Sequence, residues 1–376
     1  MEIANVALLL LEKFKSNKVI YCRTKMIIII GLGFQLQSFR SQTDALLQCH
    51  KDLKFVGSFE NAMGSGFAHF AAYLNAGMPL GPILESKLQI IEEYGYRYEQ
   101  GSFAVLFKIL RQFAINLRQR STTPTEFNGD AYKEDETLSG MNDQLRKMTL
   151  RDSSAYRIQL AFIFGDRECM LSMLNILSTY PYTFHELSRL HARLTFMGLS
   201  AFAIKYENKE VGDKCLQYFR KLSKAGSVNA KPVYLFMLAM KKPSKLAFES
   251  AIDATKEAAT IHLEAMVKEQ YGMYLQQQKE DKLAKECLAS SYFSYYDWGA
   301  HNKALRMIQQ YPFLEKSSRL KTRSLFSASC TTEISSQNPI ATKSEAGTTP
   351  AVRRVSFVYN STFKTRKLKR MDKTEC

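Results

Sequence analysis

The sequence has few of the residues that interrupt helices. It contains 18 glycines and 9 prolines among 376 residues, and most of those before residue 315 fall between apolar blocks. Because Gly and Pro mark turns, their scarcity favours long helices. Strand signals are also poor. The one long β-branched run, Ile27–Ile30, continues to Leu36 without a turn signal, so we interpret it as a buried helix face, with a buried strand as the alternative.

Membrane and disulfide signals are missing as well. No segment reaches the roughly 18 apolar residues that a spanning helix needs, and charges flank the two most apolar stretches, Val6–Leu11 and Met26–Gly33. No positive charge precedes Val6–Leu11, which disfavours a secretory signal. The seven cysteines are widely spaced without a C-x-x-C pair, as is typical of idle thiols in a reducing compartment. We therefore expect a cytoplasmic protein, with a nuclear location as the alternative that the basic C-terminus allows.

Motifs for catalysis are absent too. Gly31–Gly33 and Gly64–Gly66 lack the lysine of a phosphate loop, and no H-R-D, D-F-G or G-x-S-x-G sequence occurs. His185 and His191 are six residues apart, whereas two zinc ligands on one helix need a spacing of four. We interpret the histidines as partly buried or surface residues. The sequence predicts a protein that is not an enzyme, with no catalytic, cofactor-binding or metal-binding residues.

Positive charge is concentrated at the C-terminus. Residues 316–376 carry thirteen Lys or Arg and four acidic residues, so +9 of the net charge of +16 lies there. The remaining 315 residues are only mildly basic, which is unlike the body of a nucleic-acid-binding protein. The tail also lacks periodicity and is rich in Ser and Thr, which predicts disorder.

Apolar residues up to residue 315 recur at steps of three and four, the period of a helix. The blocks of residues 58–119 show this well, with Gly77-Met78-Pro79 as a turn and Gly95 as a helix end. The polar stretch 120–152 interrupts the blocks and is too long for a simple connection, so we expect a functional loop or a seam there.

A helical hairpin repeats about every 34 residues, the period of tetratricopeptide repeats. Small residues at fixed offsets are needed where two helices cross closely. The best unit, residues 265–298, has Gly272 in its first helix and Ala284 and Leu288 in its second. Earlier units have Ala239 with Ala251, Ala203 with Cys215 and Phe219, Ala72 with Leu84 and Leu88, and Gly33 with Ala45 and Cys49. A plain helical bundle is the alternative.

These patterns predict an all-α chain built as a right-handed superhelical stack of antiparallel helix pairs. We expect an N-terminal helix or lead-in at residues 1–17, a first sub-array at 18–119, an acidic loop or seam at 120–152, a second sub-array at 153–315 and a basic disordered tail at 316–376. The repeat-packing residues are Gly272, Ala284, Leu288, Trp298, Gly299, Ala239, Ala251, Ala203 and Phe219.

Residues 18–314 resemble the helical region of large multidomain signalling proteins. The most recognisable part is Trp298-Gly-Ala-His-Asn-Lys-Ala304, which is followed by Tyr311-Pro312. The stretches 67–95 and 126–136 resemble the same region. Proteins of that family also carry a kinase-like domain, an AAA-type ATPase domain and a histidine kinase or nucleotide cyclase. The motifs for those domains are missing here, so the resemblance implies the regulatory helical module alone. The neighbouring genomic sequence would show whether the chain is complete or a fragment of a larger protein.

The resulting hypothesis is a non-catalytic module that binds segments of partner proteins on its concave face and acts in signal transduction. Tyr271, Tyr274, Tyr292 and Tyr295 are candidates to line that face. The alternative is a protein that contacts RNA or an anionic membrane through its tail. The tail holds a candidate phosphorylation site, Ser356, and a basic cluster formed by Arg353, Arg354, Lys364, Arg366, Lys367, Lys369 and Arg370. We expect no small-molecule substrate.

Overall fold

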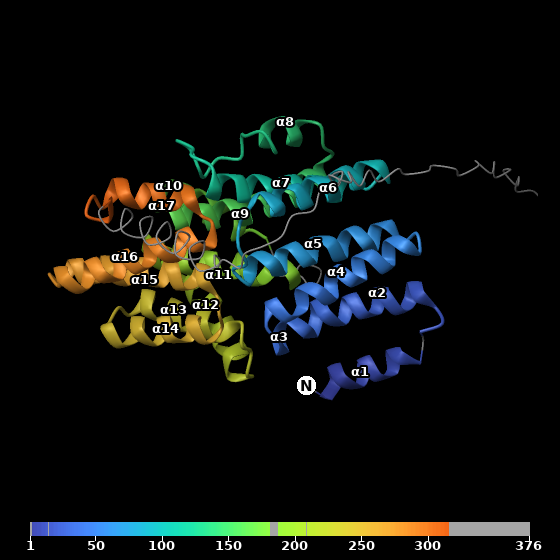
Figure 1. Cartoon of the computed structure of the whole chain (residues 1–376), viewed down its shortest axis with the longest axis horizontal. Coiled ribbons are helices and arrows are strands. Elements are labelled where there is room, and N and C mark those ends of the chain that lie inside the picture. The colour runs from blue at the N-terminus through green and yellow to red at the C-terminus, as the bar shows by residue number, and fades with distance from the viewer. Residues whose placement is uncertain (1, 14, 181–186, 208, 316–376) are drawn as a thin grey trace, which may run out of the picture. The chain divides into compact units, whose positions relative to one another are not determined.

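A computed structural model describes residues 2–13, 15–180, 187–207 and 209–315 of the chain (Figure 1). Within these ranges all regular elements are helical, apart from one isolated β-bridge between Asn128 and Lys133. The predicted all-α class is confirmed. Ile27–Ile30 lies in helix, as expected, but only Ile29 is buried and Ile27 is 46% exposed. The tail, with Ser356 and the basic cluster, lies outside the described residues.

Short helices open the chain and longer ones follow. The elements are α1 (Glu2–Glu12), α2 (Lys18–Ile28), the π-helical turn η1 (Ile29–Gly33), α3 (Phe34–Leu36), α4 (Phe39–Phe55), α5 (Phe59–Asn75), α6 (Pro82–Arg97), α7 (Gly101–Arg118), α8 (Glu134–Ser139), α9 (Asp143–Phe164), α10 (Arg167–Leu177), α11 (Leu187–Ala203), α12 (Lys209–Lys224), α13 (Ala230–Lys241), α14 (Lys245–Glu257), α15 (Ile261–Gln277), α16 (Asp281–Trp298) and α17 (His301–Gln310).

Neighbouring helices pack as hairpins. The closest pairs are α4 with α5, α6 with α7, α9 with α10, α11 with α12, α13 with α14 and α15 with α16. The predicted hairpin that joins Ala72 of α5 to Leu88 of α6 is therefore wrong, because α5 packs mainly on α4. Two buried histidines explain this pairing: His50 Nδ1 lies 2.7 Å from the Ala62 carbonyl oxygen, and His69 Nδ1 lies 2.8 Å from that of Thr43.

The same turn geometry recurs at helix ends throughout the array. A residue with positive φ follows each of nine helices, and the next amide donates to a carbonyl five residues earlier, as in Asp166 to Ala161 and Glu280 to Leu275. This is the Schellman motif, which satisfies carbonyls that the helix leaves free. Such a short turn lets the next helix run back antiparallel to the helix before it.

The first helices of successive hairpins also pack on one another. From α7 the contacts run to α9, α11, α13 and α15. Other contacts join distant parts of the chain, since α5 packs on α11 and α17 packs on α7. Helix α11 is consequently enclosed, and residues 192–201 of it are all buried. The helices are thus packed in adjacent pairs, and contacts between distant parts of the chain cover α11.

The stretch 120–152, which the sequence predicts to be a loop or seam, is partly helical. It contains α8 and the first part of α9, and buries Phe127, Tyr132 and Leu138. Side chains of α7 hold it in place: Gln112 Oε1 accepts from the amides of Ala131 and Tyr132 at 3.0 and 3.1 Å, and Asn116 Nδ2 donates to the Glu126 carbonyl at 2.8 Å. All described residues belong to one compact unit.

Candidate functional site

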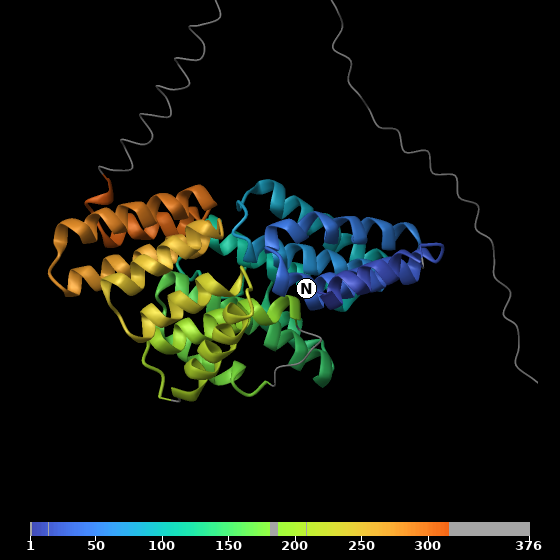
Figure 2. The same cartoon turned by 90° about the horizontal axis from the view of Figure 1, so that it is seen from below.

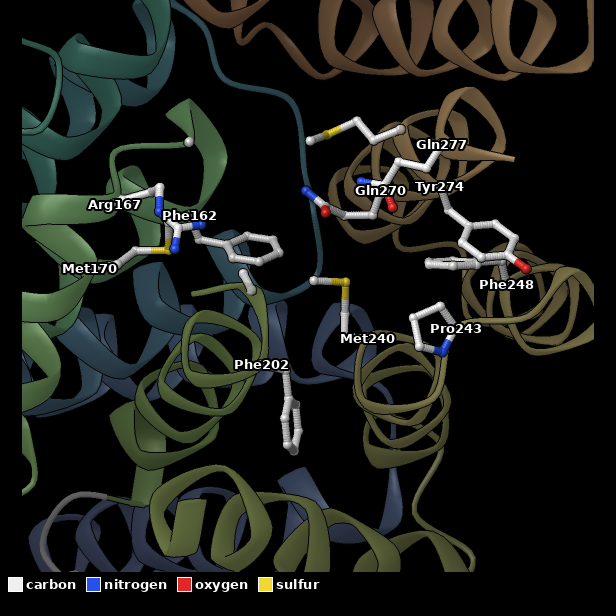
Figure 3. Close-up of a pocket in the computed structure, with 13 residues that line it drawn as sticks. Phe162, Arg167, Met170, Phe202, Met240, Pro243, Phe248, Gln270, Tyr274 and Gln277 are labelled. Carbon is white, nitrogen blue, oxygen red and sulfur yellow. The ribbon is translucent and has the colours of Figure 1, made fainter. Parts of the chain in front are cut away.

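The best candidate site is a groove at the C-terminal ends of the helices α9, α11, α13 and α15. Its central hollow has a volume of about 360 Å³. Phe162 of α9, Met240 of α13 and Gln270 of α15 point toward the middle of the hollow (Figure 3). The wall is completed by Gly165, Arg167, Met170, Phe202, Ala203, Pro243, Phe248, Met273, Tyr274 and Gln277.

The lining of this hollow is mostly apolar, with a few polar groups. Met170, Met240 and Met273 contribute thioether side chains, which adapt to ligands of different shape. The rings of Phe248 and Tyr274 lie side by side, with centroids 5.5 Å apart. Two amide side chains, Gln270 and Gln277, are placed among them and can both donate and accept hydrogen bonds. This combination suits the backbone and apolar side chains of a peptide.

Two further hollows share residues with the first and extend the groove. One, of about 480 Å³, shares Phe202, Met240, Pro243 and Gln277 with it. The other, of about 660 Å³, shares Arg167 with the first and Lys205 and Tyr206 with the second. We use the name α11-end groove for the residues that line these three hollows.

Turn geometry fixes the walls of the α11-end groove. Gly165 and Lys205 end α9 and α11 with φ values of 73° and 54°. Tyr206, which follows, donates from its hydroxyl to Asn175 Oδ1 at 2.6 Å. Gly212 of α12 lets Phe202 approach, because a Cβ there would lie 2.9 Å from the Phe202 ring. The groove therefore rests on rigid hairpins rather than on a long loop.

Charged side chains form the rim of the α11-end groove. Lys241 is paired with Asp213. Arg167 donates to the Ile204 carbonyl at 3.4 Å and stays exposed. Lys205 and Lys209 are exposed and make no ion pair with any described residue. Glu168 and Glu207 are the acidic residues nearby, so the free cations slightly outnumber the free carboxylates.

Sequence reasoning identified only part of this lining. Of the four tyrosines expected on the concave face, Tyr274 lines the groove, whereas Tyr271, Tyr292 and Tyr295 are at most 5% exposed and belong to the core. The groove face of α15 is the stripe Gln270, Met273, Tyr274 and Gln277, which has helical spacing. That mixed polar and apolar stripe is the signal that could have located the site.

The repeat-packing residues lie between helices. A Cβ on Gly272 would lie 2.7 Å from Leu288 Cγ and 3.3 Å from the Ala284 carbonyl oxygen. Ala239, Ala251 and Phe219 are fully buried, and Ala203 is half-buried at the groove. Trp298 and Gly299 pack outside their own hairpin, because Trp298 Nε1 donates to the Met78 carbonyl at 3.2 Å and the Leu80 amide donates to the Trp298 carbonyl at 2.7 Å.

The expectation that the histidines are partly buried or on the surface holds only in part: His50, His69 and His262 are buried, His191 is half-buried and His301 is at the surface. Burial lowers the pKa of both His191 and His262 to about 3. His191 lies between the rings of Phe39 and Phe219, at centroid distances of 4.9 and 5.0 Å. His301 is exposed, and His185 lies outside the described residues. Among the described side chains, no three of His, Cys, Asp or Glu are grouped as a metal site would require.

A buried ion pair and a tyrosine hydroxyl join α15, α16 and α17 near the core. Lys303 Nζ lies 2.6 Å from Glu269 Oε1, and the Tyr295 hydroxyl donates to Glu269 Oε2 at 2.9 Å. Burial, with the Glu269 carboxylate second, raises the pKa of Tyr295 well above its usual value. All three side chains are less than 8% exposed, so this cluster joins helices and offers no access to a substrate.

Among the described helices, none is both long and apolar enough to cross a lipid bilayer. Comparison of the sequence and structure with protein-family models, curated proteins and solved structures found no match.

Proposed function

We propose that the chain is a non-catalytic helical-repeat module that binds a segment of a partner protein in the α11-end groove. The observation that supports this most directly is the composition of the groove. Aromatic and Met side chains from four successive hairpins share one concave surface with the amides of Gln270 and Gln277. An extended or helical peptide with apolar anchors matches this surface.

The rim defines the expected partner further. Arg167, Lys205 and Lys209 are free to pair with carboxylates, and an arginine guanidinium is well suited to a bidentate pair with one carboxylate. The proposed ligand is therefore a segment with two or three apolar side chains flanked by Asp or Glu. The superhelical curvature expected for repeat arrays would explain why the groove runs along the first helix of each successive hairpin, from α9 to α15.

Selection from a random peptide display library tests the proposal. The intact chain should enrich apolar segments with acidic flanks, and the peptides should lose at least about tenfold in affinity for a Met240→Glu variant, which places a carboxylate in the hollow. The matched control is Leu246→Glu, at a residue that is 75% exposed on α14. Enriched peptides that bind Met240→Glu as tightly as the parent chain would refute the site.

A role in signal transduction is a second part of the proposal, and only the resemblance of residues 18–314 supports it. Its test is the neighbouring genomic sequence. A phosphate loop or a histidine-kinase core in an adjacent reading frame is the expected result. The alternative use of the tail for RNA or anionic lipid stays a prediction, since residues 316–376 lie outside the described part.

A further inference from the structure

Exposed apolar side chains are concentrated in the first 55 residues. Val6, Leu9, Leu10, Val19, Ile20, Ile27 and Phe55 are between 40% and 82% exposed. They account for seven of the sixteen large apolar side chains that the described residues expose. Single exposed apolar residues are normal, but a concentration of them on one segment marks an interaction surface.

Two of the segments that carry these residues, the start of α2 and the end of α4, meet at one end of the N-terminal helices. The α1–α2 turn and the end of α4 lie at the same end of this part of the fold (Figures 1 and 2). Both contribute to one shallow hollow of about 290 Å³, which contains Lys15, Lys18 and Phe55. Lys18 Nζ lies 5.7 Å from the centre of the Phe55 ring. Val19 and Ile20 follow Lys18 on the first turn of α2.

Phe55 is the most exposed of these side chains, at 82%. It occupies the last position of α4 and is followed by Gly57 with φ of 77°, so its ring is presented at a helix end. Helix α1 approaches the same turn with an exposed stripe, Val6, Leu9 and Leu10, at helical spacing. We call Phe55, Val19, Ile20 and the α1 stripe the N-terminal apolar surface.

Lysines surround this surface. Lys13, Lys15, Lys18, Lys51 and Lys54 are all exposed, and the acidic residues of α1, α2 and α4 are Glu2, Glu12, Asp44 and Asp52. Lys15 is paired with Glu12, and Lys54 Nζ lies 3.8 Å from the centre of the Tyr94 ring. The remaining cations have no carboxylate partner among the described residues. The surface therefore combines protruding apolar groups with a net positive charge.

We propose that the N-terminal apolar surface docks on an anionic lipid bilayer. Protruding apolar side chains can enter the boundary between headgroups and acyl chains, while the lysines interact with anionic headgroups. Charge complementarity favours this occupant over a second copy of the chain, because a symmetric contact would bring five lysines against five. This surface is distinct from the α11-end groove and from the tail, so it does not depend on either.

Vesicle binding by the full chain provides the test. Vesicles of phosphatidylcholine with about 30 mol % phosphatidylserine should bind the protein, and pure phosphatidylcholine vesicles should bind it much less. Ile20→Ser with Phe55→Ser should reduce binding at least about tenfold. Lys18→Gln with Lys51→Gln should reduce it about 25-fold, at about fivefold per lysine. Leu246→Ser with Lys242→Gln, on α14 and just after α13, is the matched control and should bind as the parent does.

Phe55→Trp gives a direct readout of insertion. Trp298 is buried and is the only other tryptophan, so a blue shift of the emission on adding anionic vesicles, and quenching by brominated lipid, would report on residue 55. Unchanged emission would overturn the proposal. So would parent-like vesicle binding of both surface variants, which would assign binding to the tail. Self-association in ultracentrifugation that the surface variants abolish, without a loss of vesicle binding, would assign the surface to a second copy instead.

Discussion

At the residue scale, positive φ values at non-glycine positions are the clearest local feature. Lys279 and Ala259 end α15 and α14 with φ of 63° and 51°. A side chain with a Cβ is strained in this region, whereas glycine is not. Lys279→Gly and Ala259→Gly should each raise the free energy of unfolding by about 0.5–1 kcal/mol, because relief of strain exceeds the added entropy of the unfolded chain.

Denaturant unfolding measures this effect. Gly226→Ala is the converse control, since Gly226 has φ of 86° with open space around the position of a Cβ. It should lower the free energy of unfolding by about 1 kcal/mol. Destabilisation by both glycine substitutions would show that the turns are not in the left-handed conformation.

Two histidines with a lowered pKa, the half-buried His191 and the buried His262, make stability depend on pH. Burial lowers the pKa of His191 and His262 to about 3, whereas the unfolded chain binds these protons near pH 6.5. Lowering the pH from 7 to 5 therefore protonates only the unfolded state and should cost up to about 2 kcal/mol per histidine. The loss continues until about pH 3, where the folded state also takes up protons.

Unfolding at pH 7 and pH 5 of the parent chain and a His191→Phe variant checks this. Phenylalanine fits between Phe39 and Phe219, so the variant should fold and show a smaller loss of stability between the two pH values. His301→Gln, at an exposed position, is the control and should leave the loss unchanged. An equal loss in the parent and His191→Phe would argue against a neutral His191 in the folded state.

At the scale of elements, close helix crossings depend on single small residues. A Cβ at Gly272 would lie 2.7 Å from Leu288 Cγ on the partner helix. Gly272→Ala should therefore lower the free energy of unfolding by about 1–3 kcal/mol despite the higher helix propensity of alanine. Shortening Leu288 on the partner helix should restore the space that the added Cβ needs. Leu288→Ala should cost less in the Gly272→Ala background than in the parent, and a double-mutant cycle measures that difference.

The sequence predicts elements better than their pairing. Apolar periodicity locates the helices of residues 58–119, and the offset from Gly272 to Ala284 identifies the α15–α16 hairpin because a glycine there permits close approach. The same reasoning assigns the wrong partner to α5. Its small residues face α4 instead. His50 of α4 contacts a carbonyl of α5, and His69 of α5 contacts a carbonyl of α4. A stripe of small residues indicates a close crossing without indicating which neighbour makes it.

The α11-end groove was harder to predict for a related reason. Of the four tyrosines expected on the concave face, only Tyr274 lines the groove, because burial favours the core for the other three. Tyr271 and Tyr295 pack between helices, and Glu249 and Glu269 accept their hydroxyl hydrogens. The groove forms instead where helix ends from four hairpins meet, and that requires the spatial order of the hairpins, which periodicity alone does not contain.

A buried ion pair also acts at this scale. Lys303 and Glu269 are 4% and 6% exposed, and their pair ties α17 to α15 at 2.6 Å. Lys303→Met leaves an unpaired buried carboxylate, which should cost about 3–5 kcal/mol. The double variant Lys303→Met with Glu269→Leu should be clearly more stable than Lys303→Met alone. Thermal unfolding of the two variants measures this, and equal stability would show that the carboxylate is solvated rather than buried.

At the scale of the whole described unit, distant segments are held together by specific polar contacts. Asn229 precedes α13 and is 7% exposed. Its Nδ2 donates to the carbonyls of Phe34 and Gln37 at 2.7 and 2.8 Å, and its Oδ1 accepts from the Phe39 amide at 3.1 Å. At another point, Asn302 Nδ2 of α17 donates to the Asn116 carbonyl of α7 at 2.8 Å. These contacts join residues about 190 positions apart.

Such contacts change how the array should unfold. In a linear repeat protein each unit contacts only its neighbours, so its ends open independently. Here the N-terminal helices are held to α13, and α17 is held to α7, so we expect the described helices to unfold as one cooperative unit. Asn229→Ala removes one side chain but leaves a buried amide and two carbonyls without partners, which should cost about 3 kcal/mol.

Hydrogen exchange distinguishes the two behaviours. In one cooperative unit, Asn229→Ala should speed exchange of the slowest amides in α9, α11 and α15 as much as in α4, because all exchange through the same global opening. Asn175→Ala is the control, since Asn175 accepts one hydrogen bond from Tyr206 at an exposed position and its loss should change global exchange little. Faster exchange confined to η1 and α4 would show instead that the N-terminal helices open alone, and that Asn229 fastens one end of an otherwise linear array.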